Sequence, residues 1–110
     1  QSTDYLPVSL VAEKEDGKVV GFIMGELFIG EYGISRDKAT LHTIIVDPDY
    51  QRKGVGEQLL KEFIDHLKAL GVQKITTLVD SDNAQLTNFF TANRFSPSKT
   101  INLERSLARR

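Results

Sequence analysis

The spacing of apolar residues predicts three strands in the first half of the chain. Residues 8–13 and 19–27 flank Glu15-Asp16-Gly17-Lys18, which is typical of a hairpin turn whose glycine takes a positive φ. Both faces of residues 19–27 are largely apolar, so we expect this strand to be central. Residues 39–46 end in four β-branched residues followed by Asp47-Pro48, which predicts a buried strand that stops at the proline.

Apolar residues recur at helical spacing in two later segments. The first is residues 57–70, with Gly71 as its expected stop, and the second is residues 84–93, preceded by the cap residues Asp80-Ser81-Asp82-Asn83. Residues 73–79 predict a strand between the helices, and alternation in residues 100–107 predicts a closing strand. The expected order is a hairpin, a third strand and then βαβαβ, with a parallel crossover.

A glycine-bearing loop connects the third strand to the first helix. Two glycines two positions apart, Gly54 and Gly56, let a ligand approach the backbone where the first free N–H groups and the helix dipole favour an anion. A Walker A loop is disfavoured because Glu57 and Gln58 follow Gly56, and a dinucleotide fingerprint would need glycine in place of Leu59. The alternative is a tight turn without a ligand.

Composition narrows the class of protein. A length of 110 residues suits one domain, and 40% apolar with 26% charged residues is ordinary for a globular protein. The net charge of -1 gives no support for nucleic-acid binding, and the lack of cysteine excludes a thiol nucleophile. Two histidines without a carboxylate cluster predict no metal site. No apolar stretch could span a membrane and no signal peptide is evident, so we expect a cytoplasmic protein.

Two motifs resemble those of the GNAT N-acetyltransferase superfamily. Residues 46–56, Val-Asp-Pro-Asp-Tyr-Gln-Arg-Lys-Gly-Val-Gly, are similar to its Gln/Arg-x-x-Gly-x-Gly/Ala loop. Residues 83–95 are similar to Asn-x-x-Ala-x-x-Phe/Leu-Tyr-x-x-x-Gly-Phe. The resemblance spans residues 8–107 and implies an α/β (α+β) fold with a mixed antiparallel/parallel sheet, flanking helices and splayed parallel strands that bind the cofactor. It implies a single domain over residues 1–110 that lacks the family's first strand and first two helices.

The resemblance also implies acetyl-CoA as co-substrate, with no metal. The backbone of Ile44, Ile45 and Val46 would pair with the pantetheine arm like an added strand. Asn83 would reach the pantetheine or its phosphate side. Phe90 is interpreted first as a core residue and second as an edge facing the cofactor. The pyrophosphate would be held by Gln51, Arg52, Lys53, Gly54, Val55 and Gly56.

The sequence departs from the family pattern where proton transfer is expected. Phe90 stands in place of the tyrosine that usually protonates the thiolate, so Tyr32 or water would act, or the thiolate would leave unassisted. The usual positions of the basic carboxylate are occupied by Thr40 and Leu78. Arg94 replaces the family's glycine, and we expect Asn93 to supply the left-handed helix stop instead.

Four residues are candidates for the general base: Glu26, Glu31, His42 and Asp80. Each has an ordinary alternative, as a solvated edge charge, a sheet histidine or a helix cap. The prediction is an N-acetyltransferase in which a primary amine of a small molecule, peptide or protein attacks acetyl-CoA directly. The alternatives are a non-catalytic acetyl-CoA/CoA-binding regulatory module and an α/β domain binding another phosphate ligand. Neither nucleic acid nor a membrane is an expected partner, and a homodimer stays open.

Overall fold

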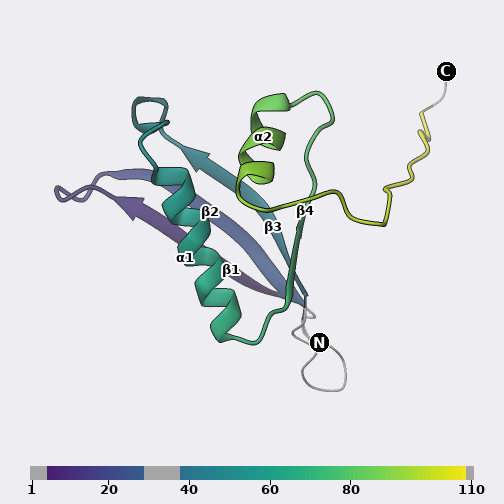
Figure 1. The fold of residues 1–110 in the computed structure, drawn as a ribbon, viewed down its shortest axis with the longest axis horizontal. Coiled ribbons are helices and arrows are strands. Elements are labelled where there is room, and N and C mark those ends of the chain that lie inside the picture. The colour runs from purple at the N-terminus through teal and green to yellow at the C-terminus, as the bar shows by residue number, and fades with distance from the viewer. Residues whose placement is uncertain (1–4, 29–37, 109–110) are drawn as a thin grey trace. The chain divides into compact units, whose positions relative to one another are not determined.

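A computed structural model of the chain describes residues 5–28 and 38–108. The chain falls into two units, residues 1–78 and 79–110. In the described residues, the first unit contains a four-stranded sheet with a long helix, and the second contains a shorter helix (Figure 1).

The sheet consists of β1 (Tyr5–Glu13), β2 (Val19–Phe28), β3 (Lys38–Val46) and β4 (Lys74–Thr77), in the order β1-β2-β3-β4. Strand β2 pairs antiparallel with both β1 and β3, and β3 pairs parallel with β4. The predicted hairpin, central second strand and parallel crossover are therefore confirmed. In the turn between β1 and β2, the Lys14 N–H donates to the Lys18 carbonyl at 2.9 Å, and Gly17 takes a φ of 90°.

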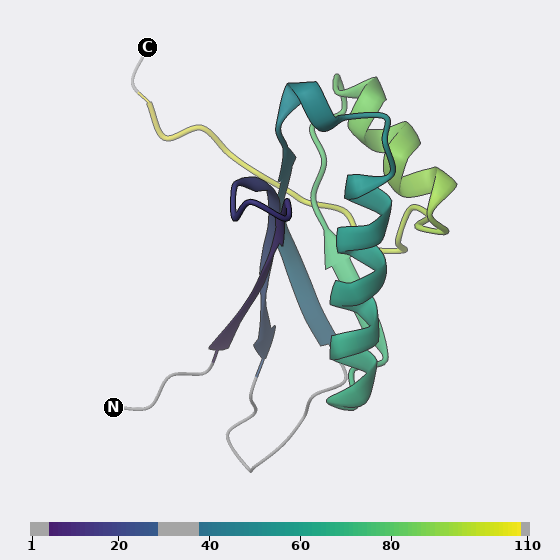
Figure 2. The same ribbon diagram turned by 90° about the vertical axis from the view of Figure 1, so that its left-hand side faces the viewer.

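Helix α1 (Val55–Ala69) lies along one face of the sheet (Figure 2). It begins two residues before the predicted start, so Gly56 belongs to its first turn, and it is followed by Gly71 with a φ of 93°. Its buried residues are Leu59, Leu60, Phe63 and Leu67. Phe63 is fully buried, and the glycine at position 25 leaves the space that its ring approaches. The apolar stripe of the sequence is thus the surface that packs on the sheet.

The parallel pairing of β3 and β4 is short. It joins Lys38–Leu41 to Lys74–Thr77, and the Thr77 hydroxyl donates to the Leu41 carbonyl at 2.9 Å. Strand β4 is shorter than the predicted 73–79, whereas β3 continues to Val46. A bulge shifts the register between β2 and β3, because Met24 pairs with Thr43 while Gly25 pairs with Leu41. The extra residue is His42, at the point where the pairing with β4 has just ended.

In the second unit, α2 (Ala84–Ala92) is capped by Asn83, whose Oδ1 accepts from the Leu86 N–H at 3.0 Å. The Phe90 side chain is 4% exposed, and its ring lies 5.4 Å from that of Phe89 and 5.0 Å from that of Phe95. This burial agrees with the interpretation of Phe90 as a core residue.

Two predictions for this unit are wrong. Residues 100–107 form no strand, and Ile101, Leu103 and Leu107 are more than three-quarters exposed. Alternation becomes a strand only beside a pairing partner, and the described residues of this unit contain no other strand. The left-handed residue after α2 is Arg94, with a φ of 75°, whereas Asn93 keeps a negative φ of -104°.

Candidate active site

The edge of β3 that faces away from β2 offers backbone groups to a ligand. The Asp47 N–H donates to the Val20 carbonyl at 2.8 Å. Because the backbone groups of successive strand residues point alternately to the two sides, the N–H and carbonyl of Ile45 also point toward β2. The backbone groups of Ile44 and Val46 then lie on the opposite edge, beyond the last residue paired with β4. The Ile45 carbonyl lies beside Gly21 of β2, so the geometry favours Ile44 and Val46 over Ile45 for the predicted backbone pairing, which stays a prediction.

Gln51 ties the following loop to this edge. Its side-chain Nε2 donates to the Val46 carbonyl at 3.0 Å. Between them, a single 3₁₀ turn, Pro48–Tyr50, is capped by Asp47, whose Oδ1 accepts from the Asp49 N–H at 2.9 Å. These two hydrogen bonds hold the loop directly after the free part of β3.

The loop itself is open. Arg52 and Gly54 both adopt left-handed φ angles, of 65° and 83°, and a Cβ built on Gly54 would meet nothing within 4 Å. The amides of the first turn of α1, including those of Val55 and Gly56, have no acceptor within the helix. With the positive end of the helix dipole and the charges of Arg52 and Lys53, this turn can bind a phosphate group.

Two of the predicted base candidates meet across the sheet. The His42 Nε2 lies 3.1 Å from a carboxylate oxygen of Glu26, with 47% and 31% of the two side chains exposed. Glu26 pairs with Thr40 on β3, on the sheet face opposite α1 since its neighbour Leu27 is buried. The bulge places His42 beside Glu26. His42 directly follows Leu41, which pairs with Thr77 as the last residue of β3 in the ladder with β4.

The remaining predicted residues are not joined to this pair. Glu31, like the alternative acid Tyr32, lies outside the described residues. Asp80 belongs to the second unit, where its carbonyl accepts from the Asn83 N–H at 2.9 Å. Asn83 and Phe90 also belong to that unit, the first as the cap of α2. Their proposed contacts with a cofactor stay predictions.

A cluster of three lysines, which the sequence analysis did not identify, surrounds Tyr50. The ammonium groups of Lys14, Lys18 and Lys53 lie 5.5, 5.8 and 5.5 Å from the centre of its ring. The Tyr50 side chain, as hydrogen-bond partner and as a charge when ionised, raises the pKa of Lys14, and Asp16 adds to the effect. No sequence signal connects a hairpin turn with a residue some thirty positions later, so only the fold could reveal this lysine cluster.

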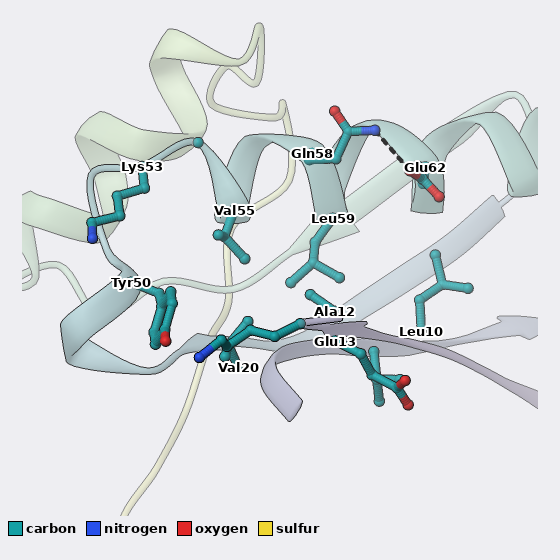
Figure 3. Close-up of a pocket in the computed structure, with 13 residues that line it drawn as sticks. Leu10, Ala12, Glu13, Val20, Tyr50, Lys53, Val55, Gln58, Leu59 and Glu62 are labelled. Carbon is teal, nitrogen blue, oxygen red and sulfur yellow. Dashed lines mark hydrogen bonds between the residues drawn. The ribbon is translucent and has the colours of Figure 1, made fainter. Parts of the chain in front are cut away.

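The lysine cluster borders a groove of about 510 Å³ between the end of β1 and the start of α1 (Figure 3). Its floor is apolar, with Leu10, Val20, Val55 and Leu59 among the lining residues. Glu62, which accepts a hydrogen bond of 2.7 Å from Gln58, lines it farther along α1.

Within residues 5–28 and 38–108, no group of three or more histidine, cysteine, aspartate or glutamate residues is placed to hold a metal ion. None of the helices in these ranges has the length and apolar character needed to traverse a bilayer.

The match to known families agrees with this geometry. The model of the acetyltransferase (GNAT) family matches residues 3–94. The chain belongs to the GNAT acetyltransferase family. The predicted fold class, a mixed sheet with splayed parallel strands, is the one observed for this GNAT chain.

Similar proteins include several acetyltransferases. The [ribosomal protein bS18]-alanine N-acetyltransferase of Escherichia coli K12 is 39% identical over 70 residues, 64% of this chain and 43% of that protein. A mycothiol acetyltransferase of Propionibacterium freudenreichii is 35% identical over 91 residues, 83% of this chain and 28% of that protein. This GNAT chain therefore spans less than half the length of these relatives.

Solved structures share the fold. A putative acetyl transferase from Pyrococcus furiosus superposes with a TM-score of 0.78 at 19% identity, covering 93% of this chain and 66% of that one. An aminoglycoside N-acetyltransferase in complex with CoA gives a TM-score of 0.74 at 19% identity, covering 91% of this chain and 75% of that one.

Proposed function

We propose that this GNAT protein is an acetyl-CoA-dependent N-acetyltransferase that acts on a primary amine of a small molecule, peptide or protein. One observation carries the proposal: the free edge of β3, where it has left β4, leads directly into an open turn of unpaired amides. A strand edge followed by a phosphate-binding turn suits a ligand with an amide-containing arm attached to a diphosphate.

The residues present fit acetyl-CoA. The backbone groups of Ile44 and the N–H of Val46 are available to the pantetheine amides, while Gln51 holds the Val46 carbonyl. The first amides of α1, with Arg52 and Lys53, would hold the pyrophosphate. When bound, acetyl-CoA supplies the acetyl group as a thioester, and transfer to an amine releases the CoA thiol.

The Glu26–His42 pair is the proposed proton acceptor. Thr40 occupies a position where the family resemblance implies a carboxylate, and Glu26 pairs with it across the sheet. The proposed carboxylate therefore lies on β2, one strand away from the position on β3 that the family resemblance implies. With Nε2–H donated to Glu26, the Nδ1 of His42 is the basic nitrogen that can accept a proton from the attacking amine.

Binding and chemistry can be tested separately. Isothermal calorimetry should detect acetyl-CoA binding, and an assay of free CoA thiol should detect transfer to a panel of amines that includes a peptide with an N-terminal alanine and an aminoglycoside. Failure of the folded protein to bind acetyl-CoA would refute the proposal.

Substitution of the pair tests its role. Glu26→Gln and His42→Ala should each lower the rate of thiol release by about a hundredfold or more while leaving acetyl-CoA affinity unchanged. The matched control is Asp65→Asn, which removes an exposed carboxylate on α1 that pairs with Lys61. Full activity in both variants of the pair would exclude it as the base.

A non-catalytic CoA-binding module is the second candidate. It is favoured by Phe90, which replaces the usual proton-donating tyrosine and is 4% exposed. This candidate predicts tight CoA binding without thiol release for any amine in the panel.

A further inference from the structure

Polar side chains from three neighbouring strands lie on the sheet face that carries Glu26 and His42. Glu26 pairs with Thr40 of β3, and Thr40 pairs in turn with Thr76 of β4. Glu26, Thr40 and Thr76 therefore form one row across the sheet, and His42 lies beside Glu26. The proposed function uses only the Glu26–His42 pair of this face, so the polar surface extends past the proposed base.

The next row of this surface contains two lysines. Lys38 lies two residues before Thr40 and pairs directly with Lys74 of β4. Ala39, between Lys38 and Thr40, is 3% exposed and pairs with the buried Leu27 on the face that α1 covers (Figure 2). Because successive side chains of a strand alternate between the two faces, Lys38 and Lys74 point to the same face as Glu26.

Both ammonium groups are available to a ligand. Lys38 and Lys74 are exposed, and among residues 5–28 and 38–108 no acidic side chain forms an ion pair with either lysine. Two lysines at paired positions also supply no attraction of opposite charges to the ladder. This part of residues 1–78 thus presents two positive charges one row away from the carboxylate of Glu26.

The spacing of the two rows selects the ligand. Two residues along a strand separate them by about 6.6 Å. An amine at Glu26 and His42 and an anionic group at the two lysines match this surface in both sign and distance. A ligand with a second positive group in place of the anion would match only the row of Glu26.

We propose that the acetyl acceptor is an amino-carboxylate, with its carboxylate about 7 Å from the amine, and that Lys38 and Lys74 bind this carboxylate. A small amino acid and a peptide with an acidic residue near its N-terminus share this chemistry. The inference rests on the proposed function and names the substrate class for the same site. In it the two lysines determine specificity, while Glu26 and His42 accept the proton.

The test compares three five-carbon amines that differ only at the end away from the amine: 5-aminopentanoate, pentylamine and 1,5-diaminopentane. In the thiol-release assay with acetyl-CoA, kcat/KM of the unmodified protein should be about fivefold higher for 5-aminopentanoate than for pentylamine, since two exposed charge pairs contribute modestly. The diamine should give the lowest value. In Lys38→Ala/Lys74→Ala, 5-aminopentanoate should lose its advantage over pentylamine. In Lys38→Glu/Lys74→Glu, the order of 5-aminopentanoate and the diamine should reverse.

The double variant Lys61→Ala/Lys68→Ala is the matched control, because it also removes two exposed lysine charges, but from α1 on the other face of the sheet. It should keep the preference for 5-aminopentanoate. Added salt should reduce this preference, since exposed charges are screened. Peptides that begin with alanine followed by aspartate, alanine or lysine extend the comparison. A higher kcat/KM for the aspartate peptide than for 5-aminopentanoate would identify an acidic peptide as the acceptor, and the reverse a small amino acid.

Equal kcat/KM for the three amines, or a preference that persists in Lys38→Ala/Lys74→Ala, would overturn the inference and leave the proposed function intact. Transfer to other amines but to no acceptor with a carboxylate would overturn it as well. Absence of transfer to every amine would instead remove the proposed function.

Discussion

At the scale of single residues, Gly25 decides how closely the strands approach at the candidate site. A Cβ at this position would clash with the Thr40 carbonyl oxygen and would lie 3.1 Å from the ring of Phe63. The oxygen belongs to the backbone of the paired strand and cannot move aside without opening the sheet. Glycine here therefore permits both the bulge at His42 and the packing of α1.

We expect Gly25→Ala to destabilise the protein by about 3 kcal/mol, because the added methyl group must displace backbone. Chemical denaturation monitored by circular dichroism measures the loss. Gly17→Ala is the control, since its Cβ would meet nothing within 4 Å and only the φ of 90° is unfavourable. Its cost should be about 1 kcal/mol, and equal costs at the two positions would contradict crowding at Gly25.

Arg94 is the second residue with a local conformation that its type disfavours. Its φ of 75° follows the end of α2, where the Arg94 N–H donates to the Thr91 carbonyl at 3.1 Å. Arg94→Gly should raise the free energy of unfolding by about 1 kcal/mol by removing the Cβ penalty. Arg105→Gly, in an exposed segment without regular structure, should give no gain. The prediction fails if the two substitutions have the same effect.

At the scale of elements, the divergence of β3 from β4 creates the cofactor edge. The last paired residues, Leu41 and Thr77, are joined by the hydrogen bond from the Thr77 hydroxyl. This contact closes the ladder just before the bulge at His42. The point at which β3 and β4 separate thus depends on one side chain of β4 as well as on the short length of that strand.

Thr77→Val keeps the shape of the side chain but removes the donor, so stability should fall by about 1 kcal/mol. The Leu41 amide should also exchange hydrogen faster if loss of this hydrogen bond makes β3 and β4 separate one or more pairs earlier. Thr76→Val on the exposed face of β4 is the control and should change stability by less than about 0.5 kcal/mol. Unchanged hydrogen exchange and stability in Thr77→Val would show that the length of β4 alone determines where β3 and β4 separate.

At the scale of the whole molecule, the candidate site depends on α1 being held against the sheet. Phe63 is fully buried at the centre of this contact, together with the buried strand residues Ile23 and Leu27. The loop of residues 51–54 is placed only because β3 and α1 are both fixed. Stability of the core and affinity for the cofactor are therefore linked in this protein.

Phe63→Ala should cost about 4 kcal/mol, a large part of the stability of a domain of this size. Acetyl-CoA should then raise the melting temperature of the variant, because a ligand that binds only the folded state stabilises it. Phe63→Leu should retain most of the stability. A loss below about 1 kcal/mol in Phe63→Ala would contradict a tightly packed contact between α1 and the sheet.

Local patterns in the sequence determined most of the secondary structure of this protein and the open turn at the start of α1. Apolar spacing specified the strands and both helices, and the order of glycines after a β-branched strand specified the open turn, because these signals act between neighbouring residues. They failed at residues 100–107, where a strand requires a distant partner. Only the tertiary structure brought Glu26 to His42 and three lysines to Tyr50, since strand register and the bulge decide which residues meet across the sheet.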